Sequence, residues 1–209
     1  IVGMQEDGRN LWNIKVENAV VSALTSSSSG SYVGGIAGQA NSNALANRFG
    51  NNSVKQAVVA GNSYIGGVDG QGNIMGDSSL TNLQNEGFIT YAENVFVSGT
   101  GSMVGAVSGE GEVYRAEVRN AYVYGTYNVG ITGNGPVQLS ACLDSVIGTV
   151  FDRESSAPNG GNKVFQNAVA QKQTYYLDLK AKTEDESICD IYNKASEILG
   201  YFKIGRASC

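Results

Sequence analysis

Tyr32-Val33-Gly34-Gly35-Ile36-Ala37-Gly38 is the stretch that decides the fold, because three related phrases follow it. They are Tyr64-Ile65-Gly66-Gly67-Val68-Asp69-Gly70, Met103-Val104-Gly105-Ala106-Val107-Ser108-Gly109 and the shortened Asn128-Val129-Gly130-Ile131-Thr132-Gly133. A repeated unit of this kind buries its apolar face only against a neighbouring copy. The repetition therefore predicts an architecture of stacked units.

Each glycine phrase is preceded by a run of β-branched, aromatic and small residues, at 17–21, 55–59, 93–97 and 119–123. The second residue of each run stands at position 18, 56, 94 or 120, so the first two intervals are equal and the third is shorter. The serine run Ser26 to Ser29 stretches the first copy and predicts a loop insertion. A constant phrase with variable spacers is typical of stacked coils whose loops leave one face.

The residues of the repeat favour strands over helices. Valine and isoleucine recur at spacings of two or three residues, and the first two-thirds of the chain lacks helical periodicity. Only two prolines, Pro136 and Pro158, remove a backbone donor, so nearly every amide is free to join a ladder. We therefore predict an all-β fold, a parallel β-helix-like solenoid over residues 1–154.

The phrase Val-Gly-Gly-Ile-Ala-Gly, preceded by Asn-Ala-x-Val, resembles the GLUG repeat. That family occurs in bacterial surface adhesin-like proteins and in the N-terminal regions of IgA1-type proteases. The resemblance covers about residues 10 to 151, and the chain departs from it at Asp69, Ala106 and Ile131. It implies a secreted or cell-surface interaction module and brings no catalytic residue with it.

Composition narrows the class of partner. The chain has 209 residues, with 14 Lys and Arg against 19 Asp and Glu, a net charge of −5 and no basic cluster. Nucleic-acid binding needs clustered cations, so we expect none. No apolar run reaches the ~18 residues of a membrane span. The chain starts at Ile1 without a visible signal peptide, and we interpret it as a mature or excised segment of a secreted protein.

Three cysteines, Cys142, Cys189 and Cys209, are an odd number. A Cys189–Cys209 disulfide with one remaining thiol would staple the tail, and Cys142–Cys189 is the rival pairing. The third alternative is three reduced, buried cysteines. Their spacing fits no zinc motif and the chain has no histidine, so we expect no metal and no cofactor.

The tail, residues 155–209, has a different pattern and is predicted to form a C-terminal cap. It comprises a loop at Ser155 to Lys163, two short strands at Phe165 to Ala170 and Thr174 to Leu179, and one amphipathic helix of about 16 residues. Thr183 to Glu186 has the form of a capping box, and Gly200 sits where a C′ glycine belongs. The predicted apolar face comprises Ile188, Ile191, Tyr192, Ala195, Ile198 and Leu199. We expect this helix to cover the exposed end coil, and docking of a partner is the alternative.

The absence of histidine removes the Ser-His-Asp and Cys-His arrangements of nucleophilic catalysis. Asp69, Asp144 and Asp152 remain as candidate carboxylates for cleaving glycosidic bonds. Calcium binding by Asp and Asn oxygens is an alternative. The ordinary interpretation is that these carboxylates lie on loops and are solvated.

Three functions from different classes therefore stand. The first is a non-enzymatic extracellular structural or adhesive module. Residues 1–15 show no capping helix, so this end could pair head-to-tail with another copy, and a cap supplied by upstream sequence is the alternative. The second is a carbohydrate-binding module that uses a tyrosine face. The third is a polysaccharide-cleaving enzyme. The partner would be a protein or glycan at a cell surface, or another copy of the chain. The candidate ligand contacts are Tyr91, Tyr114, Tyr122, Tyr124 and Tyr127.

Overall fold

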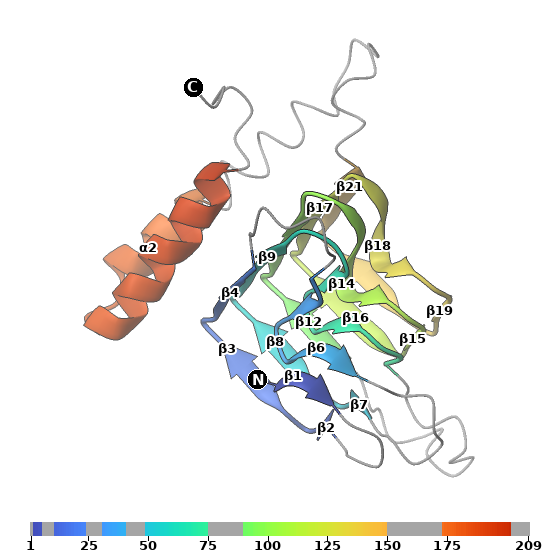
Figure 1. The fold of residues 1–209 in the computed structure, drawn as a ribbon. Coiled ribbons are helices and arrows are strands. Elements are labelled where there is room, and N and C mark those ends of the chain that lie inside the picture. Colours follow the sequence, from blue (N-terminus) through green and yellow to red (C-terminus); the bar gives the residue numbers. More distant parts are fainter. Residues whose placement is uncertain are drawn as a thin grey trace.

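The computed structural model describes residues 2–5, 11–23, 31–40, 49–74, 90–149 and 173–201. Over these residues the protein consists of stacked parallel β-sheets with two helices on one flank (Figure 1). The prediction of an all-β fold with a C-terminal helix is confirmed at this level. The predicted loop at Ser155 to Lys163 and strand at Phe165 to Ala170 lie outside the described residues.

The largest sheet, which we call sheet I, holds the glycine phrases and has seven parallel strands. Five of them lie side by side in the order β1 (Val2–Gln5), β6 (Ala37–Ala40), β11 (Asp69–Gln71), β14 (Ser102–Glu110) and β18 (Tyr127–Asn134). The other two are β5 (Val33–Gly34), which pairs with β10 (Ile65–Gly66), and β10 in turn pairs with β14.

Two further parallel sheets have five strands each. Sheet II runs β3 (Lys15–Glu17), β8 (Ser53–Lys55), β12 (Thr90–Glu93), β16 (Ala116–Arg119) and β20 (Ala141–Leu143). Sheet III runs β4 (Val20–Ser22), β9 (Val58–Gly61), β13 (Phe96–Gly99), β17 (Tyr122–Gly125) and β21 (Val146–Thr149). Between sheets I and II lie two small pairs, β2 (Leu11–Trp12) with β7 (Phe49–Gly50) and β15 (Val113–Tyr114) with β19 (Val137–Gln138).

The chain visits sheets I, II and III in the same order five times, and we call each pass a round. Rounds 1 to 5 end with β4, β9, β13, β17 and β21. Residues at one position in successive rounds are in register, and we call such a set a column. One column is Val20, Val58, Phe96, Tyr122 and Val146. Its first four members each belong to one of the four predicted runs, and the fifth round is an addition.

The bend between sheets II and III has the same backbone conformation in every round. Its residues have φ between 47° and 53°, and they are Asn18, Gln56, Asn94, Asn120 and Asp144. Left-handed φ is uncommon outside glycine, and asparagine and aspartate tolerate it best. The asparagine at the second place of most predicted runs therefore serves to turn the chain.

Inward-facing side chains from all three sheets form one apolar core. Sheet II contributes the column Val54, Ala92 and Val118, and sheet III contributes Val59, Val97 and Val123, all with 0% exposure. Strand alternation places these residues inside and their sequence neighbours outside. Burying each valine stabilises the fold by about 1.5–3 kcal/mol relative to leaving it exposed.

The first helix spans residues 173–181, so the predicted strand at Thr174 to Leu179 is wrong. Tyr176 is 1% exposed and Leu179 half-buried, three residues apart, which is a helical spacing. Threonine and tyrosine suggested a strand, but their β-propensity takes effect only where they can pack beside a neighbouring strand. Here the neighbour is Tyr192 of the second helix, whose ring centroid lies 5.9 Å from that of Tyr176.

The second helix, α2 (Glu186–Tyr201), has the predicted 16 residues but differs at both ends. Asp185, not Thr183, is the N-cap, because its Oδ1 accepts hydrogen bonds from the amides of Ser187 at 2.9 Å and Ile188 at 3.4 Å. The Ser187 hydroxyl also donates to Asp185 Oδ1. This bond, followed by the two amide bonds, holds the pKa of the Asp185 carboxyl below its usual value. Gly200 lies inside the helix and does not end it. Neither described helix has the length and apolarity needed to cross a membrane.

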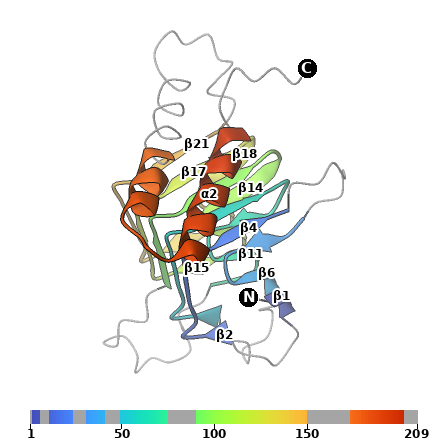
Figure 2. The ribbon, with the colours of Figure 1, turned by 90° about the vertical axis from the view of Figure 1, so that its left-hand side faces the viewer.

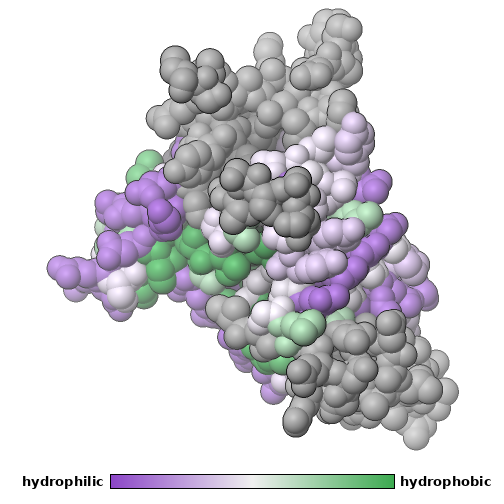
Figure 3. All heavy atoms as spheres, viewed as in Figure 1, coloured by the Kyte–Doolittle hydropathy of each residue, from purple (hydrophilic) through white to green (hydrophobic). Residues whose placement is uncertain are grey.

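Both helices lie against the outer face of sheet III, so the prediction that α2 covers the end coil is wrong (Figure 2). Sheet III is apolar on its outer face as well, where Val58, Phe96 and Tyr124 are at most 4% exposed. The predicted helix face is confirmed for Ile188, Ile191, Tyr192 and Ala195, which pack in that cluster. Figure 3 shows apolar side chains gathered where the helix meets the strands, with hydrophilic ones on its outer side.

Candidate functional site

Round 5 forms one end of the stack. Its strands β18, β19, β20 and β21 pair with β14, β15, β16 and β17 on one side. On their other side, no element within the described residues pairs with them. Unpaired parallel strands present rows of amide and carbonyl groups that can template another strand.

The same column is buried in the middle of the stack and open at this end. Val54, Ala92 and Val118 are 0% exposed, whereas Cys142, which continues their column, is exposed. Cys142 therefore occupies a core position that no round in the described part of the chain covers.

Large apolar side chains gather in this round. Four of the eight large hydrophobic residues that are exposed among the described residues belong to it: Tyr127 at 56%, Val137 at 42%, Leu139 at 70% and Leu143 at 43%. Leu139 also has φ of 48°, a conformation that a branched side chain seldom adopts. Exposed apolar surface concentrated at one place is typical of interaction sites.

The opposite end of the stack is round 1, with β1, β3 and β4. Among the described residues these strands pair only with round 2. Val16 and Val21 are half-buried although they occupy core columns, and Met4 is 60% exposed. At both ends of the stack, the core columns of sheets II and III therefore end in residues that are only half-buried or exposed.

The five candidate tyrosines do not form one face. Tyr91 lies on the outer side of sheet II, and Tyr127 is in sheet I. Tyr114 is in β15, with the Arg115 guanidinium 5.9 Å from its ring centre. Tyr122 and Tyr124 are on sheet III beneath the helices, and Tyr124 is only 4% exposed. The predicted stripe fails because the tyrosines belong to different columns and sheets, which their sequence spacing alone does not reveal.

The two described candidate carboxylates, Asp69 and Asp144, are also separated. Asp69 faces the core from β11 with 0% exposure, and its burial raises its pKa well above the usual value. Asp144 is an exposed corner residue of round 5. Asp152 lies outside the described residues. A buried and an exposed carboxylate cannot flank one glycosidic bond, so this pair does not form the arrangement that such cleavage requires.

The described cysteines do not pair with each other. Cys142 is exposed in β20, and the Cys189 thiol contacts the carbonyl of Thr183 at 3.7 Å. The rival pairing Cys142–Cys189 is therefore not formed. Cys209 lies outside the described residues, and the Cys189–Cys209 disulfide stays a prediction. No cluster of three potential metal ligands occurs in the described part of the chain.

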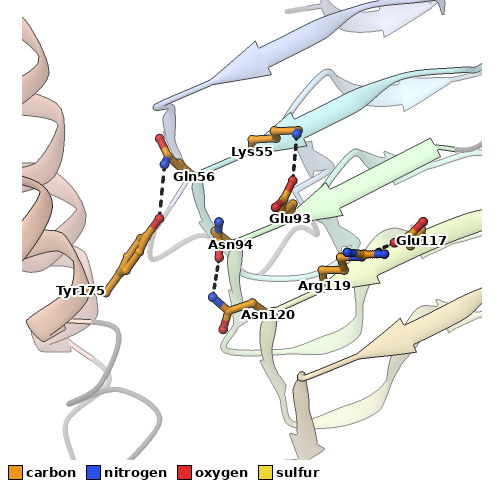
Figure 4. A network of polar contacts seen from close by, with 8 residues as sticks. All are labelled: Lys55, Gln56, Glu93, Asn94, Glu117, Arg119, Asn120 and Tyr175. Atoms are coloured by element: carbon orange, nitrogen blue, oxygen red, sulfur yellow. Dashed lines mark hydrogen bonds and ion pairs between the residues drawn. The ribbon is translucent and has the colours of Figure 1, made fainter.

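Polar ladders on the outer face of the stack join neighbouring rounds (Figure 4). Lys55 Nζ lies 2.8 Å from Glu93 Oε2, and Asn120 donates a hydrogen bond to Asn94. On sheet I, Gln39 donates to Gln71 at 2.8 Å, and Gln71 donates to Glu110 at 2.6 Å. The hydrogen bond to Glu93 is the main reason why the pKa of Lys55 is raised. These ladders favour one register between rounds, because a slip of one residue breaks all of them.

Comparisons with protein-family models, with characterised proteins and with solved structures found no match. The resemblance to the GLUG repeat therefore rests on the four phrases and their preceding runs. Round 5 is the part of this candidate site that the sequence reasoning missed. Its signal was present: Leu143-Asp144-Ser145-Val146-Ile147 repeats Arg119-Asn120-Ala121-Tyr122-Val123 with aspartate in the asparagine place.

Proposed function

We propose that this protein is a non-enzymatic structural repeat module, of the GLUG type, that assembles through its open ends at a cell surface or outside the cell. On this proposal the stacked sheets form a three-sided parallel β-helix-like solenoid. A low charged fraction of 16% and the 28 glycines suit such a fold, and the resemblance supplies the location. Its partner is another copy of the chain or a surface protein or glycan.

One observation carries the proposal: the exposed apolar residues coincide in round 5 with strand edges that have no partner within the described residues. Leu139, 70% exposed, and the open core position of Cys142 lie on the same edge. Proteins normally protect such edges with charges, prolines or covering elements. Here α2 covers the flank, and the charged pair Lys55–Glu93 lies in the middle of sheet II. Round 5 has a proline, Pro136, and a charge, Asp144, only at its bends, and its strands β18, β19, β20 and β21 contain neither.

Light scattering across protein concentration, with negative-stain images of the same samples, tests the proposal. Mass that rises with concentration, together with elongated particles, is the expected result. A monomer of constant mass at all concentrations would contradict it.

A matched pair of variants shows whether the edge is responsible. Leu139→Lys places a charge on the open edge and is expected to lower assembly at least several-fold. Tyr91→Lys adds the same charge at an outward position of round 3, where the side chain is 37% exposed, and is expected to leave assembly unchanged. Equal loss in both variants would point to net charge and not to the edge.

No specific observation favours the two alternatives. The five candidate tyrosines lie in four different places and therefore form no continuous aromatic face for carbohydrate binding. Glycan cleavage lacks a carboxylate pair among the described residues.

A further inference from the structure

We infer that round 5 of one copy pairs in parallel register with round 1 of the next, so that Cys142 stacks on Val16 and Ile147 on Val21 of the second copy. This inference rests on the proposed function and adds its geometry. It follows from extending the pairing inside the chain by one more step.

The first argument is that two core columns are incomplete at both ends. One column runs Val16, Val54, Ala92, Val118 and Cys142 in sheet II. The other runs Val21, Val59, Val97, Val123 and Ile147 in sheet III. Their three middle members are 0% exposed in both sheets. Joining the ends places the Cys142 thiol on Val16 and Ile147 on Val21. Both contacts bury apolar surface, as the middle rounds of each column do.

The second argument is that the bends of the two end rounds coincide. Asp144 has φ of 50°, and Asn18 at the same bend of round 1 has 52°. At the bend before sheet II, Leu139 has φ of 48° and Asn13 has 61°. Strands on either side of a bend can pair simultaneously only if both rounds turn at the same residues. A tail-to-tail contact between two copies of round 5 would run the strands antiparallel and lose this match.

The third argument concerns the outward residues, which meet without like charges. In this register Ala141 lies beside Lys15, and Leu143 lies beside Glu17. Between them the same outward column alternates in sign through Lys55, Glu93 and Arg119. Like charges opposite one another would oppose the contact, and none occurs between these pairs. The contact is heterologous, so repetition of it produces a filament.

Register-specific cross-linking tests the inference on the full chain. In a Cys189→Ser, Cys209→Ser background, Val16→Cys adds a second thiol beside the native Cys142. In-register neighbours of a parallel ladder have Cα atoms about 4.8 Å apart, within the range of about 4.4–6.8 Å seen in disulfides. Oxidation, or a short bis-thiol reagent, is expected to give a ladder of covalent oligomers on a non-reducing gel.

Val21→Cys in the same background is the matched control. It changes the same residue type, at an equally half-buried inward position of round 1, but in sheet III, away from Cys142. At least ten-fold less oligomer than with Val16→Cys is expected. Adding Ile147→Cys and Cys142→Ser to Val21→Cys is expected to restore the ladder.

An outward pair covers the case in which the core substitutions unfold the end rounds. In a background without native cysteines, Lys15→Cys with Ala141→Cys is expected to cross-link. Lys15→Cys with Leu143→Cys, displaced by two residues along the strand, is expected to cross-link much less. Lys15, Ala141 and Leu143 are all exposed, so these changes leave the core intact.

The outcomes separate the register from the proposed function. Rising mass with equal or reversed cross-linking of the matched and mismatched pairs overturns the register and leaves assembly intact. A dimer linked through Cys142 alone shows tail-to-tail contact and overturns the inference. Constant monomer mass without any cross-link overturns both.

Discussion

Asp69 lies beside Ser108 in the parallel register of β11 and β14, at the same inward-facing position, yet the two side chains differ in their bonding. The Ser108 hydroxyl donates to the carbonyl of Gly72 at 3.1 Å, and Thr132, one round further, donates to Gly111 at 2.9 Å. Neither oxygen of Asp69 has a well-formed hydrogen bond within the described residues. The two following positions of this column thus satisfy a hydroxyl donor, Ala37 before it has no polar side chain, and a buried carboxylate at Asp69 is costly.

Asp69→Ser is expected to stabilise the protein at pH 7.5 by about 1–3 kcal/mol, the cost of a buried unsatisfied polar group. Burial raises the pKa of Asp69, and the poorly aligned amides of Gln71 and Gly70 offset only part of this effect. The folded state then keeps the proton that the unfolded chain releases near pH 4. Stability therefore falls as pH rises from about 4 towards the folded-state pKa. Urea unfolding at pH 4 and 7.5 should show a large gain at pH 7.5 and almost none at pH 4. An equal gain at both pH values would mean that ionisation of Asp69 plays no part.

Gly67→Ala is expected to destabilise the protein by about 1–3 kcal/mol, as overpacking does. A Cβ at Gly67 would lie 2.1 Å from the carbonyl oxygen of Ala106, which belongs to the backbone of the next round. Gly3→Ala is the control, because a Cβ there meets nothing within 4 Å. Thermal unfolding should separate the two variants clearly, and a Gly67→Ala protein as stable as the control would refute this close packing.

Tyr192→Ala is expected to loosen α2 while the sheets survive. Tyr192 is 6% exposed, and its hydroxyl donates to Asn18 Oδ1 at 3.0 Å. Removing the ring costs roughly 3–5 kcal/mol, whereas Tyr192→Phe loses only the hydrogen bond, about 0.5–1.5 kcal/mol. Hydrogen exchange should show lost protection in α2 for the alanine variant, with β13 still protected. Equal loss in both elements would mean that helices and sheets unfold together.

Glu93→Lys is expected to destabilise the protein by about 1 kcal/mol at low salt, through like charges in one column. The substitution removes the ion pair with Lys55 and places a cation between Lys55 and Arg119, which are in register on either side. Because these side chains are exposed, about 1 M salt should recover most of the loss in urea unfolding. Glu93→Gln, which removes the pair without adding repulsion, is expected to cost at most a few tenths of that amount.

The stacking could be predicted from the sequence because it depends on local signals repeated in every round. The asparagine bends, the valine columns and the spacing of the four runs all follow from residues that lie close in the chain. The run 143–147 of round 5 escaped prediction because no glycine phrase follows it in the sequence and Asp144 replaces asparagine. Aspartate tolerates the same left-handed bend, so the backbone continues although the phrase does not.

The placement of the helices and the fate of the tyrosines could not be predicted locally. Which face α2 covers depends on the outward column Val58 and Phe96, whose members are distant in the chain and become neighbours only in the stack. Nothing in the sequence indicates that Tyr122 and Tyr124 are covered, but in the structure both pack in that same contact with the helices. The predicted loop insertion at Ser26 to Ser29 and the predicted loop and strand within 150–172 lie outside the described residues.

The unequal length of the rounds has a practical consequence for engineering. The last round advances the column from Tyr122 to Val146 with a much shorter stretch of chain than the step from Val58 to Phe96, and both deliver a strand in register. The register between neighbouring strands therefore does not depend on the number of residues that connect them. Rounds of different length could therefore be exchanged as building units in an engineered stack, because each keeps its strands in register with its neighbours.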